Sequence, residues 1–207
     1  IFDTALGLVL NWTNRLLFLK LLESQLLAFN KGAFSKFLTI SIIPDYDVLN
    51  DLFMKVLAVP VDHREDEFRE TFKDVPYLNS SLFEKSAMEK KFFPISGIRL
   101  GSMEVMNQTA IKDNNGKRFK GSLSTLEYLF RFLDAYDFGI EKQGADRLLQ
   151  QESKTIINAS VLGKIFEKIN GYKDGSFFTP GYITEYICHK TLRRAVVNRF
   201  NDIKGWT

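Results

Sequence analysis

A glycine-led apolar run near the C-terminal end of this chain ends in a Thr-Pro pair, and a helical pattern begins directly after it. The run is Gly175-Ser176-Phe177-Phe178-Thr179-Pro180. Threonine suits the N-cap of a helix, where its hydroxyl accepts a backbone N–H one turn ahead, and proline suits the first helical position. The run therefore predicts a strand, a turn and a helix over residues 180 to about 194, with Thr179 as its cap.

The start of such a helix is a natural seat for an anion. Free backbone N–H groups and the positive end of the helix dipole point outward there. Phe177 and Phe178 flank this position, so the seat is half apolar and suits a ligand with an anionic end and an aromatic or aliphatic body. An ordinary strand-to-helix turn explains the same residues equally well.

The run also resembles the opening motif of DNA methyltransferases that modify N6 of adenine, in the gamma-type motif order. The resemblance implies that Thr179 contacts the amino-acid end of S-adenosylmethionine. It implies further that Phe177, Phe178 and Pro180 form the wall of this cofactor site. The helix that follows would pack behind the catalytic sheet.

Further segments extend the resemblance over nearly the whole chain. They are similar, in order, to the helical connector of type IIG restriction–modification enzymes, which carry nuclease, connector, adenine methyltransferase and target-recognition region in one polypeptide. These segments are residues 14–23, 50–58, 75–84, 133–138 and 157–167. The resemblance implies a connector domain over residues 1–170 and the start of the methyltransferase domain over residues 171–207.

Two motifs of a complete adenine methyltransferase do not occur in the sequence. The five prolines include no Pro-Pro pair, so the Asn/Asp-Pro-Pro-Tyr/Phe loop that holds a flipped adenine is missing. The glycine-rich turn that approaches the cofactor is missing too. The chain begins at Ile1 and stops at Thr207. We therefore expect an internal fragment without catalytic residues, inactive alone, from a parent enzyme that uses S-adenosylmethionine and DNA.

The composition is that of a globular piece with a core of its own. The 207 residues are 45% hydrophobic and 26% charged, which is enough for one domain or slightly more. One cysteine, Cys188, excludes an internal disulfide and fits the reducing cytoplasm. The most apolar stretch, residues 16–27, contains Lys20 and Glu23 and is shorter than the ~20 residues of a membrane span, so a core helix is expected there rather than a membrane helix.

Hydrophobic period and turn residues predict a mainly α-helical domain with one small β-hairpin. Asp113-Asn114-Asn115-Gly116 is a strong turn signal between two short extended runs, so the hairpin is expected at about residues 103–121. A solvated turn or short surface helix is expected over residues 62–71, and a short helix over residues 32–38. Further helices are expected over residues 5–29, 44–58, 126–134 and 161–169, the last ended by Asn170-Gly171. The inner stripe of the helix over residues 44–58 should be Leu49, Leu52, Phe53, Val56 and Leu57.

Basic residues surround the expected hairpin tip. They are Lys112, Lys117, Arg118 and Lys120. Contacts from such residues to phosphates position DNA without reading its sequence, so Lys117, Arg118 and Lys120 are the predicted DNA contacts. A solvated hairpin is the simpler explanation of the same charges, because a net charge of +3 does not by itself indicate nucleic-acid binding.

Two other function classes stay open. One is a helical protein-interaction module unrelated to DNA, for which the Thr-Pro helix start is a coincidence. The other is a nuclease, which needs two carboxylates for Mg²⁺ and a lysine on adjacent strands. Pro44-Asp45 and Glu89-Lys90-Lys91 fit this pattern only loosely, since both segments are expected at helix ends. The resemblance to type IIG enzymes implies that the Mg²⁺-dependent nuclease of the parent lies before Ile1. Neither His63 nor His189 belongs to a cluster of Cys, His or carboxylate residues with metal-ligand spacing, and both are expected at the surface.

Overall fold

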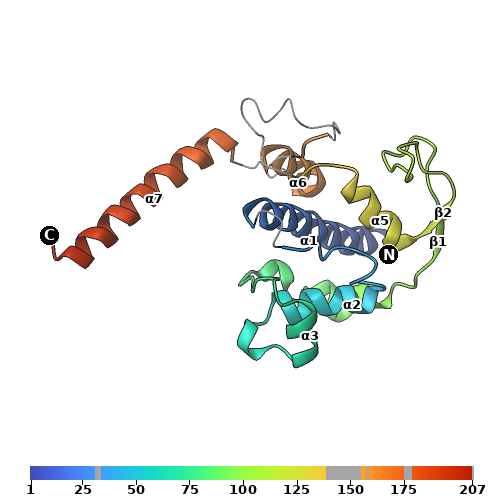
Figure 1. The fold of residues 1–207 in the computed structure, drawn as a ribbon, viewed down its shortest axis with the longest axis horizontal. Helices are drawn as coiled ribbons and strands as arrows, with labels where there is room; N and C mark the ends of the chain where they lie inside the picture. Colours follow the sequence, from blue (N-terminus) through green and yellow to red (C-terminus); the bar gives the residue numbers. More distant parts are fainter. Residues whose placement is uncertain (31–33, 139–154, 158, 175–178, 207) are drawn as a thin grey trace. The chain divides into compact units, whose positions relative to one another are not determined.

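A computed structural model describes residues 1–30, 34–138, 155–157, 159–174 and 179–206 of the chain. The chain divides into two units, Ile1–Ala159 and Ser160–Thr207, and each is described by itself. The described residues are mainly helical, with one two-stranded antiparallel sheet (Figure 1). The predicted fold class, a mainly α-helical chain with a small hairpin, is confirmed.

The first unit is built on α1 (Phe2–Phe29), the longest helix of the described residues. Its buried apolar residues, Leu8, Trp12, Leu16 and Leu19, join the main core. By length and composition alone α1 could also cross a membrane, a test that the core helix of a soluble protein passes as well. Three charged residues of α1, Arg15, Lys20 and Glu23, are buried among polar partners of the same unit. We therefore describe α1 as a core helix.

A second helical stretch packs into the same core, at the predicted place. Asp45 caps α2 (Tyr46–Asp51) by accepting the N–H of Val48 at 2.9 Å. The stretch continues as a π-helical segment, η1 (Leu52–Leu57). The predicted inner stripe is confirmed, because all five of its members are fully buried: Leu49, Leu52, Phe53, Val56 and Leu57.

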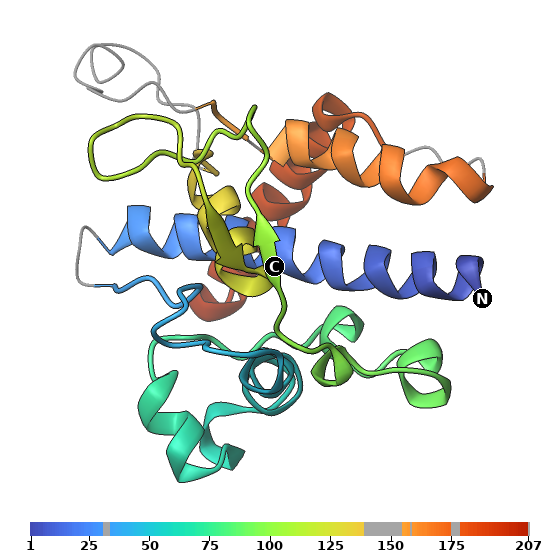
Figure 2. The same cartoon turned by 90° about the vertical axis from the view of Figure 1, so that its right-hand side faces the viewer.

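Short helical pieces surround this stretch. They are η2 (Val61–His63), α3 (Asp66–Thr71), η3 (Ser81–Phe83), α4 (Ala87–Lys91) and η4 (Ile95–Gly97). In both views α2 and α3 lie on the same side of α1 (Figures 1 and 2). The ring of Phe83 links the two layers, because its centroid is 5.9 Å from that of Phe18 on α1 and 6.1 Å from that of Phe53 on η1.

The predicted surface helix over residues 62–71 is present as α3, but the segment also buries a charge. Arg64 is nearly inaccessible, and its guanidinium donates to the carbonyl oxygens of Val59 and Val75 at 3.3 and 2.9 Å. Burial lowers the pKa of Arg64. This arginine therefore closes a loop by satisfying backbone carbonyls that the short helices leave without partners.

The hairpin strands are β1 (Ser102–Glu104) and β2 (Ser122–Ser124), paired antiparallel with Met103 opposite Leu123. Helix α5 (Thr125–Asp134) follows at once, and the hydroxyl of Ser124 caps it by accepting the N–H of Glu127. Strand β1 covers only the start of the extended run predicted at residues 103–111, and β2 lies beyond the run predicted at residues 117–120. They lie at the base of a long loop, whose own pairing is described below.

The predicted short helix over residues 32–38 is wrong for its described part. Residues 34–38 form no helix. The carboxylate oxygen Oε1 of Glu23 accepts the N–H groups of Phe37 and Leu38, both at 2.8 Å. Since those two N–H groups are held by α1 and Phe37 and Leu38 are buried, the chain runs along the core instead of coiling.

The second unit contains α6 (Ala159–Asp174) and α7 (Gly181–Lys204). Both are longer than expected. Asn170-Gly171 does not end α6, since a glycine inside a helix costs only about 1 kcal/mol and no proline follows. Helix α7 runs ten residues beyond the expected end near Arg194 and stops at Gly205, which has a left-handed φ of 67°. The opening strand predicted before α7 falls on residues 175–178, outside the described residues.

Candidate nucleic-acid interface

The loop between β1 and β2 turns back on itself at the predicted place. Asp113 holds the turn: its Oδ1 accepts the N–H groups of Asn115 and Lys117, both at 2.9 Å. Gly116 provides the left-handed backbone that the turn needs, with φ of 75°. Lys112 and Arg118 then face each other in an antiparallel bridge. The predicted turn is therefore confirmed, with the pairing next to it reduced to this bridge.

A small apolar cluster anchors the loop to the rest of the unit. Val105, Ile111 and Leu123 are buried together, and Phe119 and Tyr128 pack against them. The N–H of Phe119 donates to the carbonyl of Ile111 at 2.9 Å. Because side chains alternate between the two faces of a hairpin, the burial of Ile111 and Phe119 leaves their neighbours, Lys112 and Arg118, exposed.

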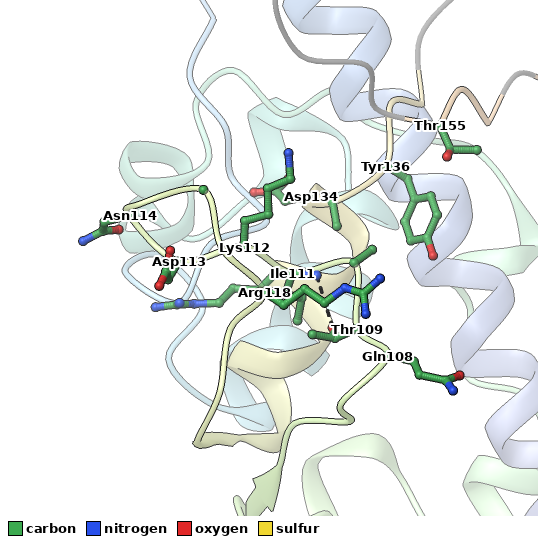
Figure 3. Close-up of a pocket in the computed structure, with 14 residues that line it drawn as sticks. Gln108, Thr109, Ile111, Lys112, Asp113, Asn114, Arg118, Asp134, Tyr136 and Thr155 are labelled. Carbon is green, nitrogen blue, oxygen red and sulfur yellow. Dashed lines mark hydrogen bonds between the residues drawn. The ribbon is translucent and has the colours of Figure 1, made fainter.

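A groove of about 820 Å³ lies between this loop and the C-terminal end of α5. Gln108 and Asn114 lie at opposite ends of its lining (Figure 3). Most of the lining residues are polar, and they include both cationic and anionic side chains. The lining consists of Gln108, Thr109, Ala110, Ile111, Lys112, Asp113, Asn114, Gly116, Arg118, Arg131, Asp134, Ala135, Tyr136 and Thr155. We call this feature the hairpin groove.

Two cations of the hairpin groove have no partner of opposite charge in the part of the chain that the structure describes. Among the described residues, no carboxylate lies within 4.0 Å of the charged nitrogens of Lys112 or Arg118. The third cation is engaged, because Arg131 pairs with Glu127 at 2.7 Å and its guanidinium lies 5.4 Å from the centre of the Phe119 ring. The carboxylate of Asp113 holds the turn, as described above.

The second carboxylate of the groove, Asp134, belongs to a network that reaches into α1. Its Oδ1 accepts from Lys20, and its Oδ2 lies 3.2 Å from the ammonium of Lys36. Lys20 also donates to Glu23 at 2.7 Å, and Glu23 in turn holds the backbone of residues 37 and 38. The network thus fixes the end of α5, and with it one wall of the groove, to the core helix.

The electrostatics of this network favour the charged forms of Lys20 and Asp134. Burial opposes the ammonium of Lys20, but the charges and hydrogen bonds of Glu23 and Asp134 outweigh it and raise the pKa of Lys20. Burial likewise opposes the carboxylate of Asp134, but Lys20 and Lys36 outweigh it and lower the pKa of Asp134. Both residues are therefore ionised at neutral pH and form an ion pair.

The three predicted DNA contacts are placed as follows. Lys117, Arg118 and Lys120 are all exposed. Arg118 lines the hairpin groove, together with Lys112. The loop therefore presents the predicted basic cluster to solvent, and DNA binding by this cluster stays a prediction.

A family described as a domain of unknown function, DUF7814, matches residues 1–157. The chain belongs to this family. The match covers the whole hairpin groove and ends before α6 and α7. In the terms of the fold, DUF7814 corresponds to the first unit.

One curated relative matches almost the whole chain. It is a protein of Methanocaldococcus jannaschii named as a candidate type II restriction enzyme and methyltransferase, and it is 28% identical over 214 residues. The alignment covers 93% of this chain and 15% of the relative, so the chain spans a small part of the length of the protein it matches. No solved structure matches the chain.

The predicted cofactor wall lies beyond the DUF7814 match, at the start of α7. Phe177 and Phe178 fall outside the described residues. The predicted cap is wrong: Pro180 holds the N-cap position, no side chain caps the helix, and Thr179 lies one residue further out. The carbonyl of Pro180 accepts the N–H groups of Ile183 and Thr184 at 2.9 and 3.2 Å, which places the first helical residue at Gly181. Thr179 and Pro180 are both exposed.

The residues that loosely fit a nuclease pattern within the DUF7814 region have other roles in the structure. The carboxylate of Asp45 caps α2, and Glu89 is buried in an ion pair with Arg15. Within the described ranges, no group of three or more His, Cys, Asp or Glu side chains is arranged to hold a metal ion. His63 and His189 are exposed, as predicted. Asp45 and Glu89 thus have structural roles.

Sequence reasoning missed several members of the hairpin groove. Arg131, Asp134 and Tyr136 come from α5 and the residues just after it, and Thr155 lies further along the chain. The pattern of Arg131, Asp134 and Tyr136 along the chain is that of an ordinary helix end. Only the folding of the loop against α5 brings them beside Lys112 and Arg118, and no local signal in the sequence encodes that packing.

Proposed function

We propose that this chain is the helical connector of a type IIG restriction–modification enzyme, followed by the first helix of its adenine-N6 methyltransferase domain. The observation that carries the proposal is the match over 93% of the chain to a relative named as a candidate type II restriction enzyme and methyltransferase. The order of the connector-like segments and the Gly-Ser-Phe-Phe-Thr-Pro run support the finer assignment.

In this proposal, residues 1–170 connect the nuclease to the methyltransferase, and residues 171–207 begin the methyltransferase. The internal bracing of the first unit suits a connector. A buried ion pair ties α1 to α4 and a partly buried one ties α1 to α5, and breaking a buried pair is costly. A stiff connector holds two enzymatic domains at a set separation in the cytoplasmic parent.

The start of α7 would supply one wall of the S-adenosylmethionine site. When bound, this cofactor supplies the methyl group. Helix α7 has no side-chain cap, so its first N–H groups are available to a carboxylate such as the one at the methionine end of the cofactor. The hydroxyl of Thr179 is exposed beside them. Phe177, Phe178 and Pro180 would form the apolar part of the wall.

Methyl transfer by the full-length parent tests this function. We expect the parent to transfer tritium from labelled S-adenosylmethionine to N6 of adenine in duplex DNA, and to cleave DNA in the presence of Mg²⁺. The 207-residue chain alone should do neither, since its sequence lacks the base-binding loop. A parent that methylates no adenine, or an isolated chain that does, contradicts the proposal.

A further inference from the structure

The antiparallel bridge places Lys112 and Arg118, two residues of like charge, opposite each other on the loop. In such a pair the Cβ atoms are roughly 4.5–5.5 Å apart, and like charges in this position are destabilising. Both side chains line the hairpin groove. No carboxylate among the described residues lies at ion-pair distance from either of them. Both side chains are exposed, so an anion from solvent can reach them.

The two carboxylates of the groove are engaged with other partners. Asp113 uses one oxygen for two backbone N–H groups of the turn, and Asp134 is held between Lys20 and Lys36. Lys112 and Arg118 therefore donate no hydrogen bond to these two carboxylates. An anion that enters the groove could accept hydrogen bonds from both cations. The amide of Gln108 and the hydroxyls of Tyr136 and Thr155 add neutral donors along the same lining.

We propose that Lys112 and Arg118 form a phosphate-binding site in the hairpin groove, and that a phosphate of the DNA backbone fills it. The guanidinium of Arg118 can donate two parallel hydrogen bonds to phosphate oxygens, and the ammonium of Lys112 adds a point charge. This inference rests on the proposed function, which brings DNA to the parent enzyme. It extends the predicted contact from the loop tip into the groove, and adds Lys112 to it.

Backbone phosphate suits the groove better than the edge of a base. Exposed Lys117 and Lys120 flank Arg118 on the same loop, so several cations can meet successive phosphates of one strand. Such contacts fix the position of DNA and carry no sequence information. The site would therefore hold the connector against DNA of any sequence.

The test compares two double variants of the full-length parent that remove the same charge. In Lys112→Ala/Arg118→Ala the groove loses both cations. In Lys73→Ala/Arg99→Ala two exposed cations elsewhere in the first unit are removed.

Binding to a cognate duplex and to a random duplex is measured by fluorescence anisotropy over a salt series. The groove variant should weaken binding to both duplexes about equally, and should flatten the salt dependence by roughly 0.9 for each phosphate that the protein no longer neutralises, up to about 2. The control variant should match the unmodified enzyme.

A second arm separates DNA from free phosphate. Inorganic phosphate is titrated into the unmodified and groove-variant parents while NMR or fluorescence reports on the loop, with chloride at equal ionic strength as the reference. An unchanged DNA salt slope with a phosphate response that only the unmodified protein shows would overturn DNA as the source. An unchanged slope and no phosphate response would overturn the site.

Failure of this site is distinguishable from failure of the proposed function. If the parent methylates adenine and the groove variant binds DNA with an unchanged slope, the groove proposal alone is wrong. If the groove variant shows the flattened slope in a parent that methylates no adenine, the groove stands and the methyltransferase assignment is wrong. Equal thermal midpoints for both variants confirm that each one is folded.

Discussion

Arg15 on α1 and Glu89 on α4 form a two-pronged ion pair, with N–O distances of 2.6 and 2.8 Å, in which each side chain is only 1% exposed. The carboxylate of Glu89 also accepts the indole N–H of Trp12 and the backbone N–H of Ser86, both at 2.9 Å. The other side of the guanidinium donates to the carbonyl oxygens of Leu82 and Glu84. Residues 74 positions apart are thereby locked together inside the core.

Glu89→Gln should destabilise the chain strongly. The amide keeps the shape of the carboxylate but leaves the Arg15 charge buried without a counterion, and removal of one partner of a buried pair costs about 3–5 kcal/mol. Urea unfolding followed by circular dichroism measures the loss. Asp51→Asn, which breaks the exposed pair with Lys55, is the matched control and should cost less than about 1 kcal/mol. Equal effects of the two substitutions would contradict a stabilising role for the buried pair.

The same carboxylate should make stability fall in acid. Burial opposes the ionisation of Glu89, but hydrogen bonds from Arg15, Ser86 and Trp12 outweigh it and lower its pKa from 4.5 to about 2. Because the unfolded state binds the proton first as pH falls, the contribution is complete above about pH 5 and is lost between there and pH 2. The loss is on the order of 3 kcal/mol. Unfolding free energies measured across this range should slope less steeply in Glu89→Gln; an identical slope would assign the acid sensitivity to other groups.

Lys20→Met should cost far more than Lys36→Met. Lys20 is buried between Glu23 and Asp134, whereas Lys36 is 46% exposed at the edge of the same network. Loss of Lys20 leaves the fully buried Glu23 without its counterion, for an expected cost of about 3–5 kcal/mol. Loss of Lys36 should cost under about 1 kcal/mol. The two midpoints of chemical denaturation decide the matter, and similar midpoints would show that Lys20 does not stabilise the fold through this network.

Gly116→Val should disturb the turn of the hairpin loop without a steric clash. A side chain at this position meets nothing within 4 Å, but the φ of 75° is one that β-branched residues avoid. The expected cost is roughly 1–2 kcal/mol, and DNA binding through Lys112 and Arg118 should weaken with it, because the turn sets their bridge. Gly116→Asn, which tolerates this backbone, should retain most of both properties. Loss of stability in the asparagine variant as large as in the valine variant would show that the backbone conformation is not the cause.

Thr179→Val in the full-length parent should raise the Kd for S-adenosylmethionine. The substitution keeps the shape and removes the hydroxyl, and loss of one buried hydrogen bond in the complex costs about 1–3 kcal/mol, on the order of tenfold or more in affinity. Thr191→Val is the control, since the hydroxyl of Thr191 only donates to the carbonyl of Ile187 one turn back in α7. Calorimetry with unchanged affinity for Thr179→Val would place this residue outside the cofactor site.

Local patterns predicted local structure well. The period of Leu49, Leu52 and Phe53 gave a correct buried stripe, and Asp113 and Gly116 marked the turn of the loop. Each of these features depends on neighbours a few residues away. The extent of α7 was underestimated, because no strong helix breaker occurs between Arg194 and Gly205 and the chain continues as a helix until that glycine.

Long-range polar contacts were not predictable in the same way. Lys20 and Glu23 in an apolar stretch argued against a membrane span, but nothing near them in the sequence pointed to Asp134 as a partner. Glu89 fitted a loose metal pattern, although the structure uses it for Arg15. The same limit applies to the hairpin groove, since a sequence shows which residues are charged but not which charges meet.

The ion pairs of α1 also set an order of events during synthesis. Asp134 lies 114 residues after Lys20, and at ~5–20 residues per second the ribosome takes roughly 6 to 23 s to add it. For that interval the ammonium of Lys20 can pair with Glu23 on the same helix but not yet with Asp134. The ion pairs that hold α1 in the core are therefore complete only after α4 and then α5 have left the ribosome.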